Sequence, residues 1–252
     1  MKYIDHTGYN FTLPRQPQRI ISLVPSQTEL LYYLGVEPVG QTIFCFHPAS
    51  HFKDSTKIGG TKNLQLSKIE QLKPDLILGN KEENNQEQIE HLRKRYPVWL
   101  SDIKTIADSI NMITSIGDLI GKTEQAADLS HLIEQGFGNL NLKKKASILY
   151  IIWRGPYMAA GKDTYINSMI EASGYSNALE LDSLRYPSIT NKEITESEPD
   201  EIWLSSEPYP FKDKHIEELQ MIAPKARIKL VDGELFSWYG PRMLKTIDYL
   251  SK

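Results

Sequence analysis

The stretch RIISLVPSQTELLYYLGVEPVG, Arg19 to Gly40, contains the pattern of a strand, a turn and a helix in that order. The run Ile20–Val24 is apolar and β-branched, so it predicts a buried strand, which Pro25 ends because proline has no N–H to donate. Ser26 predicts a helix N-cap, and Glu29 three residues later predicts a capping box. The stretch therefore predicts the first half of a βαβ unit, whose turn presents backbone N–H groups at a helix N-terminus.

Length and composition describe an ordinary globular chain. The 252 residues are enough for one large core or two smaller ones. Hydrophobic residues make up 40% and charged residues 24%, which is usual for a globular protein. The net charge of −3 argues against a nucleic-acid partner. The lone Cys45 excludes an internal disulfide.

The location of the protein is predicted from its first residues. The N-terminus, MKYIDHTGYNFTL, has no apolar segment of the signal-peptide type, and no apolar run in the chain is long enough to span a membrane. If Met1 is the natural start, we expect a cytoplasmic protein. The alternative is a periplasmic or membrane-associated protein from which a signal sequence has been removed.

An α/β layout is repeated along the chain at an interval of about 125 residues. Pro74 precedes an aspartate and an apolar strand, and Pro199, 125 positions later (199 − 74), does the same. Ile69 and Ile194, in the helical segments before these strands, have the same separation. The repeat predicts two α/β halves of one design, and the cleft between them is the expected ligand site.

The residues between the two halves have a different pattern. Ile106, Ile110, Ile113 and Ile120 fall at helical spacing, and Gly121 is a tolerated interruption that costs about 1 kcal/mol. Residues 103–138 therefore predict one long helix or two nearly collinear ones, on the order of 50 Å in length. The predicted fold is α/β, with two Rossmann-like lobes with parallel sheets joined by one long backbone helix. The predicted domains are residues 1–102, 103–142 and 143–252.

Aromatic and charged side chains follow the predicted strands in both halves. Ligands of open α/β sheets bind outside the carboxyl ends of the strands, so these side chains should converge there. Packing is the alternative for any single aromatic residue, but the shared strand-end position favours a pocket. The predicted ligand-binding residues are Phe44, Phe46, His47, Lys62, Asn80, Glu82, Trp153, Arg154, Tyr157, Tyr186, Glu207, Phe236 and Trp238.

Motifs of common enzymes and metal sites do not occur in the sequence. There is no G-x-S-x-G, no H-E-x-x-H and no pair of cysteines. An alternative function is nevertheless a cytoplasmic metal-site protein or enzyme, in which His47, Glu82 and Glu207 bind a divalent ion. Three N and O ligands of this kind suit zinc or a similar metal.

Several of these segments together resemble one family. The opening stretch, the LKPDLILGN strand, the long central helix and the second half resemble the periplasmic-binding-protein family for iron chelates and vitamin B12. The likeness is greatest to the cobalamin-binding proteins of ABC transporters and covers nearly the whole chain. It implies a class III solute-binding fold that captures a cobalamin or an iron chelate between its lobes, without catalysis, a resident cofactor or a metal site.

Individual site residues can be carried over from the resemblance. Phe44 matches the aromatic residue that follows the second strand in cobalamin binders, and Tyr186 matches the aromatic residue before proline in the second lobe. A third aromatic residue falls at Tyr157 or Met158. Glu82, Arg154 and Glu207 make the implied site more polar than a corrinoid pocket, although such charges also suit ion pairs.

Two tryptophans of the family are absent from this chain. Thr61 and Asn80 stand near the positions where cobalamin binders have them, and Trp153 and Trp238 are the tryptophans that can compensate. Both follow predicted strands of the second half, so we predict that they line the cleft and face the first lobe. The alternative for Trp238 is packing in the core of its lobe.

The resemblance also implies a partner, the permease of an ABC transporter. Family members dock on it through one glutamate on each lobe. The matching positions here are Ser67 and Lys192, with Glu70 and Glu193 close by.

Overall fold

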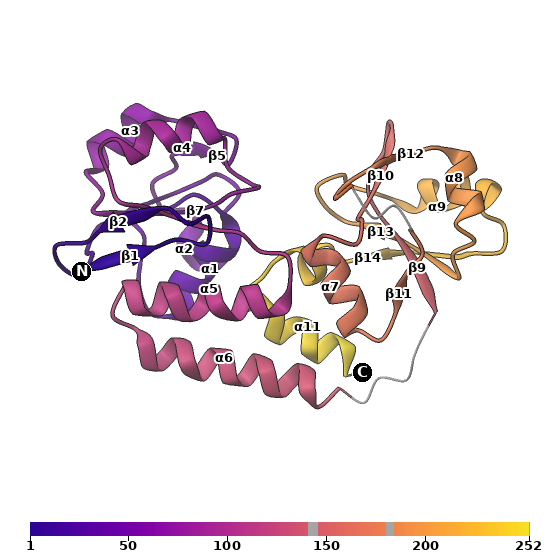
Figure 1. The fold of residues 1–252 in the computed structure, drawn as a ribbon. Helices are drawn as coiled ribbons and strands as arrows, with labels where there is room; N and C mark the ends of the chain where they lie inside the picture. Colours follow the sequence, from indigo (N-terminus) through magenta and orange to yellow (C-terminus); the bar gives the residue numbers. More distant parts are fainter. Residues whose placement is uncertain (141–145, 180–183, 252) are drawn as a thin grey trace. The chain divides into compact units, whose positions relative to one another are not determined.

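A computed structural model of the protein describes residues 1–140, 146–179 and 184–251. The chain forms two compact units, each made of more than one segment (Figure 1). Unit 1 comprises Met1–Ile103, Ala107–Glu134 and Tyr239–Met243, and unit 2 comprises Lys104–Ile106, Gln135–Trp238 and Leu244–Lys252. The three domains predicted from the sequence stay a prediction, and the boundary after residue 142 lies outside the described residues.

Unit 1 is built on a parallel sheet with the strand order β4-β3-β7-β8. Since β4 and β7 lie on opposite sides of β3, the winding direction reverses at β3, and its carboxyl end is a topological switch point. The strands of unit 1 are β1 (Lys2–Ile4), β2 (Asn10–Thr12), β3 (Ile20–Ser22), β4 (Gly40–Gln41), β5 (Gly59–Gly60), β6 (Asn63–Leu64), β7 (Leu76–Asn80) and β8 (Val98–Ser101). The helices before the linking segment are α1 (Pro25–Tyr33), α2 (Ala49–Phe52), α3 (Leu66–Leu72) and α4 (Gln86–Arg93).

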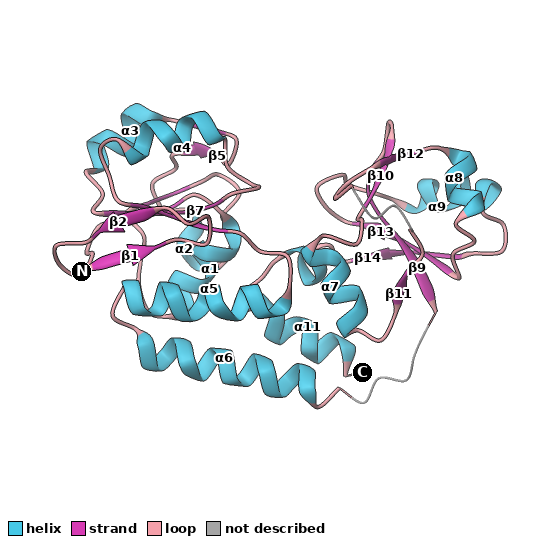
Figure 2. Cartoon of the chain, viewed as in Figure 1, coloured by secondary structure: helices cyan, strands magenta, loops and turns pink. Residues whose placement is uncertain are grey.

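Unit 2 has the same parallel order, β11-β9-β13-β14, with antiparallel β10 and β12 added beside β9 (Figure 2). Its strands are β9 (Ser147–Trp153), β10 (Tyr157–Ala159), β11 (Ser176–Asn177), β12 (Ser188–Ile189), β13 (Glu201–Ser205) and β14 (Arg227–Val231). The helices of this half are α7 (Tyr165–Ala172), α8 (Asn191–Glu196), α9 (Asp213–Ile222), α10 (Glu234–Ser237) and α11 (Arg242–Leu250).

The internal repeat is confirmed at the level of single residues. Strand β7 begins at Leu76 and β13 at Glu201, 125 positions later (201 − 76). Asp75, just before β7, accepts hydrogen bonds from backbone N–H groups at the start of β3, with N···O distances of 2.7–3.1 Å. Its counterpart Asp200 accepts from the Ser147 N–H at the start of β9, at 2.8 Å. One carboxylate in each unit therefore fixes where the central strand begins.

Backbone conformation repeats as well. Lys73 and Glu198, each directly before the proline of its repeat, have φ angles of 47° and 38°. Within the described residues they are the two non-glycine positions with positive φ. Such a conformation costs on the order of 1 kcal/mol, so its presence at equivalent positions reflects a shared turn rather than chance.

The predicted capping box at the first helix is wrong. The N-cap of α1 is Val24, with Pro25 at the first helical position and no side-chain cap. Proline suits that position because its fixed φ is helical and its missing N–H would be unpaired there anyway. The second strand of unit 1 is short: β4 covers only Gly40–Gln41, and the residues after it form a loop.

The predicted single or collinear linking helix is replaced by two helices packed side by side. Helix α5 spans Ile106–Leu119 and α6 spans Thr123–Gly138 (Figure 1). Gly121 between them has a φ of 69°, which reverses the chain, and the Lys122 N–H bonds to the Gly117 carbonyl at 2.7 Å. An αL glycine of this kind terminates a helix instead of interrupting it, and the apolar spacing alone does not distinguish the two outcomes.

Gly117 is where these two helices approach most closely, and it carries a testable prediction. A Cβ added at Gly117 would lie 2.3 Å from the Cβ of Ala126. We therefore expect Gly117→Ala to destabilise the protein by about 1–3 kcal/mol, as overpacked sites do. Thermal unfolding measures the loss, and adding Ala126→Gly should recover part of it. Gly138→Ala is the matched control, because nothing lies within 4 Å of a Cβ there. An unchanged Tm for Gly117→Ala would contradict the close packing.

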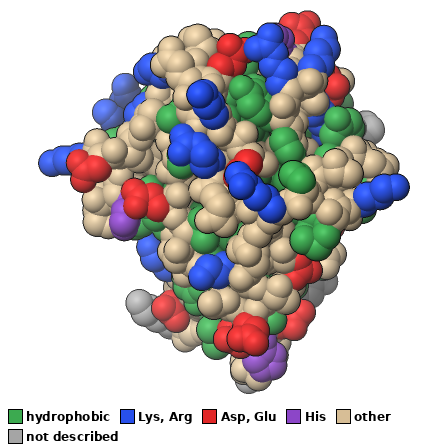
Figure 3. Space-filling view, turned by 90° about the vertical axis from the view of Figure 1, so that its left-hand side faces the viewer, with side chains coloured by type: hydrophobic (Ala, Val, Ile, Leu, Met, Phe, Trp, Pro, Cys, Tyr) green, Lys and Arg blue, Asp and Glu red, His purple; other side chains and the backbone are tan. Residues whose placement is uncertain are grey.

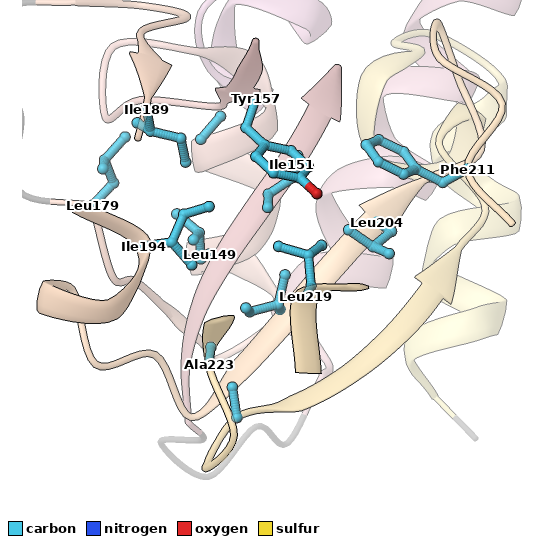
Figure 4. Packing of buried hydrophobic residues seen from close by; sticks show 13 residues of the cluster. Leu149, Ile151, Tyr157, Leu179, Ile189, Ile194, Leu204, Phe211, Leu219 and Ala223 are labelled. Atoms are coloured by element: carbon cyan, nitrogen blue, oxygen red, sulfur yellow. The ribbon is translucent and has the colours of Figure 1, made fainter. Parts of the chain in front are cut away.

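Each unit has its own hydrophobic core. In unit 1, Ile21, Leu23, Ile77 and Leu78 of β3, β7 and the β3–α1 turn are fully buried. In unit 2, Leu149 and Ile151 of β9 pack with Leu204 of β13 and Leu219 of α9, and Figure 4 shows these side chains in one cluster. Two independent cores explain why the contacts separate into two units.

The surface and the helices place two limits on function. On the face shown in Figure 3, side chains of both charge signs lie scattered among uncharged groups, without the uniform basic surface of a nucleic-acid interface. None of the helices described is long and apolar enough to cross a bilayer.

Candidate functional site

In unit 1, exposed aromatic side chains follow strand β4. Phe44 is 45% exposed and Phe46 is 38% exposed. The Phe46 ring lies 5.8 Å from the ring of His47 and 6.3 Å from that of Phe52. Exposed aromatic side chains next to one another are unusual on a soluble surface, and they suit stacking on a flat ligand. Phe44 and Phe46 are named the unit 1 aromatic pair below.

A buried network holds the loop that carries the unit 1 aromatic pair. Gln41 Nε2 donates to the Cys45 carbonyl at 2.7 Å, and the Thr28 hydroxyl donates to Cys45 Sγ at 3.0 Å. Thr42 Oγ1 lies 3.1 Å from the same sulfur. Burial raises the pKa of the Cys45 thiol, so it stays protonated at neutral pH and is not a nucleophile. The network therefore anchors the loop and has no chemistry of its own.

Strand β7 ends in a loop shaped by Asn80, whose side chain is 3% exposed. Asn80 Oδ1 accepts from the N–H groups of Glu82 and Glu83 at 2.8 and 3.0 Å, and its Nδ2 donates to Ser101 Oγ at 3.0 Å. Lys62 donates from Nζ to the Glu82 carbonyl. Asn80 thus presents no surface to a ligand, contrary to its prediction as a binding residue. Its amide positions the half-buried Glu82.

In unit 2, Trp153 stands at the end of β9 and is 41% exposed. Its ring lies 5.6 Å from the ring of Tyr209 in an edge-to-face arrangement, and Tyr209 lies 4.7 Å from Phe211. Tyr209 follows β13, so the two strand ends meet through these rings. The set of Trp153, Tyr209 and Phe211 is named the unit 2 aromatic wall; Phe211 is buried in the core and supports Tyr209 from behind. Tyr209 was missed as a site residue, although its position between two prolines after a strand was a usable signal.

Arg154 is engaged with a carboxylate of its own unit. Its guanidinium reaches Glu218 at 2.9 Å, and the Tyr157 hydroxyl donates to the same carboxylate at 2.7 Å. These hydrogen bonds lower the pKa of Glu218, with the Tyr157 bond contributing most. Because Glu218 already neutralises it, Arg154 is held in place beside the unit 2 aromatic wall.

Glu207 is a half-buried carboxyl after β13. Its Oε1 accepts from the Ser237 hydroxyl at 2.7 Å and from Trp238 Nε1 at 2.8 Å. Burial raises the pKa of this carboxyl, although both hydrogen bonds oppose the rise. Trp238 itself is 6% exposed, which favours the packing alternative over the predicted ligand-facing role.

Two further predicted site residues are buried in unit 2, which favours packing over the predicted contact with a ligand. Phe236 is 0% exposed, with its ring 5.1 Å from that of Trp203 and 5.9 Å from that of Tyr150. Tyr157 belongs to the apolar cluster of Figure 4 and is 8% exposed. Phe236 follows strand β14 and Tyr157 begins strand β10, but neighbouring elements cover both side chains. The other predicted residues, His47 and Tyr186, are half-buried.

The alternative metal centre is not supported. Among residues 1–140, 146–179 and 184–251, no group of three or more His, Cys, Asp or Glu side chains is arranged to hold a metal ion. His47 and Glu82 belong to unit 1, whereas Glu207 belongs to unit 2 and bonds to Ser237 and Trp238.

Comparisons with known proteins point to one family. The family described as "Periplasmic binding protein" matches residues 20–223. An uncharacterised ABC transporter substrate-binding lipoprotein of Bacillus subtilis is 26% identical, over 98% of this chain and 83% of its own length. The vitamin B12-binding protein of Pectobacterium carotovorum is 25% identical, over 90% of this chain and 85% of its length. A solved structure of a possible iron-binding periplasmic solute-binding protein from Staphylococcus epidermidis has a TM-score of 0.78 at 26% identity, covering 94% of this chain and 98% of that one.

These comparisons settle the fold class and correct the predicted location. The α/β class with parallel sheets, of the periplasmic solute-binding type, is confirmed. The expectation of a cytoplasmic protein is wrong, because the relatives are named as periplasmic proteins and as a substrate-binding lipoprotein. With a match over residues 20–223 and both halves of the fold in place, the chain belongs to the periplasmic binding protein family.

Proposed function

We propose that this protein is a solute-binding protein of an ABC importer, works outside the cytoplasm, and captures a metal chelate of the corrinoid or iron-siderophore type. One observation carries the proposal: large aromatic side chains remain exposed at the carboxyl ends of the parallel strands. Phe44, Phe46 and Trp153 are each more than a third exposed. Organic chelates offer broad apolar faces, which aromatic rings bind well.

The groups around these rings favour binding over catalysis. The buried Cys45 thiol is protonated, and the Arg154 guanidinium and the Glu207 carboxyl are held by hydrogen bonds within unit 2. A site of fixed polar groups and exposed rings selects a shape and provides no activated nucleophile. We therefore propose that the chain has no enzymatic activity and no resident cofactor, and that the metal arrives as part of the cargo.

Titration of the purified protein tests the proposal. Cyanocobalamin, hemin and a ferric siderophore would each be added while tryptophan emission is followed, with calorimetry as a second measurement. Saturable binding of one chelate, with a stoichiometry of about one, is the expected result. Failure of all three to bind would refute the proposal.

Trp153→Ala is the sharpest single-residue test of the site. A stacked aromatic face contributes about 1 kcal/mol beyond its buried area, so we expect a loss of chelate affinity of roughly tenfold. Since Trp153 is 41% exposed, its removal should leave the Tm almost unchanged. Trp238→Ala is the comparison, because at 6% exposure it should lower the Tm markedly. A Trp153→Ala protein with unchanged affinity would show that Trp153 does not belong to the site.

The proposed partner is the permease of the importer. Helices α3 and α8 occupy equivalent places in the repeat and carry Glu70 and Glu193. Glu193 accepts from the Thr190 N–H at 2.7 Å within a capping box, whereas Glu70 pairs with Arg95. Ser67 and Lys192 stand at the matching position of the repeat itself. If the acids form the contact, Glu70→Gln should weaken stimulation of the importer's ATPase and leave chelate affinity unchanged.

A further inference from the structure

His215 lies directly behind the unit 2 aromatic wall. It is the third residue of α9 and is 3% exposed. Its ring lies 5.5 Å from that of Tyr209 and 5.4 Å from that of Phe211. Two of the three rings of the wall, those of Tyr209 and Phe211, therefore contact this imidazole. The third ring, that of Trp153, contacts Tyr209.

Both ring nitrogens of His215 have defined neighbours. Nδ1 accepts a hydrogen bond from the backbone N–H of Lys212 at 2.8 Å, which caps the first turn of α9. An accepting Nδ1 carries no proton, so the proton of the neutral ring is on Nε2. Nε2 lies 3.4 Å from the hydroxyl oxygen of Tyr209, which is the direction in which that proton points. The neutral ring thus joins the start of α9 to the loop that carries Tyr209.

A second proton would break this arrangement. It can attach only to Nδ1, where it would face the Lys212 N–H, and two donors cannot share a hydrogen bond. The hydrogen bond from the Lys212 N–H at the start of α9 would be lost, and a buried cation would stand beside the rings of Tyr209 and Phe211.

The charged groups around His215 also oppose protonation. Arg154, on the turn after β9, and Lys214, on α9 itself, are cations that face the ring. Glu218, one turn along α9, is the anion that favours protonation, but it is paired with Arg154 and with the Tyr157 hydroxyl. Burial is the largest cause that lowers the pKa of His215, followed by the charges of Lys214 and Arg154.

We propose that His215 is a positioning residue for the unit 2 aromatic wall, and that it holds Tyr209 against Trp153 only while its imidazole is neutral. Acidification then loosens the loop between β13 and α9 and weakens chelate binding. The expected change in chelate affinity rests on the proposed function, whereas the expected change in the position of the aromatic wall does not. It makes the protein a binder whose affinity falls in an acidic medium.

The sign of the pH effect follows from the lowered pKa. In the unfolded chain histidine titrates near pH 6.5, and in the folded protein it titrates at a lower pH. Between these values the unfolded state binds more protons, so the stability contributed by neutral His215 is complete above about pH 6.5 and decreases as the pH falls below it. The wall itself loosens where the imidazole of the folded protein takes up its proton, which is at a lower pH. His6, which also has a pKa lowered mainly by burial, contributes to stability with the same sign, but it belongs to unit 1.

The first experiment needs no ligand. Nitrogen-15 NMR of the histidine rings at about pH 8 should show His215 as the tautomer protonated on Nε2. On titration to about pH 5, protonation of His215 should coincide with a change in the emission of Trp153, assigned by its loss in Trp153→Phe. The opposite tautomer, or titration of His215 without a change at Trp153, would overturn the inference.

The second experiment uses cyanocobalamin as the probe and His215→Gln as the variant. Glutamine at the third helical position can accept from the cap N–H but does not titrate. We expect the wild-type affinity to fall roughly tenfold between about pH 8 and pH 5, and the variant to change less than about twofold. His131→Gln, at an exposed position of α6, is the matched control and should keep the full pH dependence. An identical pH profile in His215→Gln would contradict the inference. If cyanocobalamin does not bind at any pH, only the corrinoid form of the proposed function fails, and the ferric siderophore replaces it as the probe.

Discussion

Arg242→Met is expected to destabilise the protein by about 3–5 kcal/mol. Arg242 is 4% exposed and binds Glu29 of α1 through two hydrogen bonds, of 3.0 and 2.9 Å. Removing the guanidinium leaves the Glu29 carboxylate with 13% side-chain exposure and without its cation, so most of the loss is the cost of an uncompensated charge. Urea unfolding measures the total, and hydrogen exchange of the β3 and β7 amides assigns it to unit 1.

Arg95→Met is the matched control for this prediction. Arg95 pairs with Glu70 in the same unit, but the two side chains are 56% and 39% exposed. An exposed pair contributes about 0–1 kcal/mol, so the control should be nearly neutral. The double variant Arg242→Met with Glu29→Gln removes both charges and should recover part of the loss. Equal losses in the free energy of unfolding for Arg242→Met and Arg95→Met would show that the buried pair contributes no more to stability than the exposed pair.

Phe236→Ala should have an effect of similar size for a different reason. The ring is fully buried against Trp203, Tyr150 and Tyr249, and truncation of such a side chain typically costs about 3–5 kcal/mol. Thermal or urea unfolding, with emission from the tryptophans of unit 2, measures the loss. Chelate affinity of the folded fraction should be unchanged, because the ring reaches no surface.

Phe236→Leu provides the comparison, since it removes less volume and should cost clearly less than the alanine variant. If Phe236→Ala unfolded with normal stability but no longer bound the chelate, Phe236 would be a residue of the binding site. That pair of measurements separates a strand-end aromatic residue that packs from one that binds.

Much of the fold could be predicted because its signals are local. The proline and aspartate before β7 recur before β13 at the same interval, and each strand contains a run of three apolar residues, 76–78 and 202–204. Thr164 caps α7 through its side chain, as its position before an apolar helical pattern indicates. The strand-end positions of Phe44 and Trp153 could be predicted for the same reason, since a strand and its end are visible within a few residues.

Exposure could not be predicted in this way. Trp153 and Phe236 are both aromatic residues near the ends of predicted strands, yet one is 41% exposed and the other 0%. The difference arises from what packs on them: Phe236 meets rings from β9, β13 and α11, which are distant in the sequence. The contacts of Tyr209 with Trp153 and His215 could not be predicted either, because they join three separate segments.

The start of α1 shows which features the local sequence determines and which depend on tertiary contacts. The sequence by itself determined that a helix follows Val24, because Pro25 cannot extend the strand and suits the first helical position. It could not determine the roles of Ser26 and Glu29, which have the spacing of a capping box. In the folded unit, Ser26 Oγ accepts from the N–H of Tyr239 at 3.3 Å and Glu29 binds Arg242. Residues 239–243, more than two hundred positions away, compete for these two side chains, and a hydrogen bond or ion pair buried in a core outweighs a local cap exposed to water.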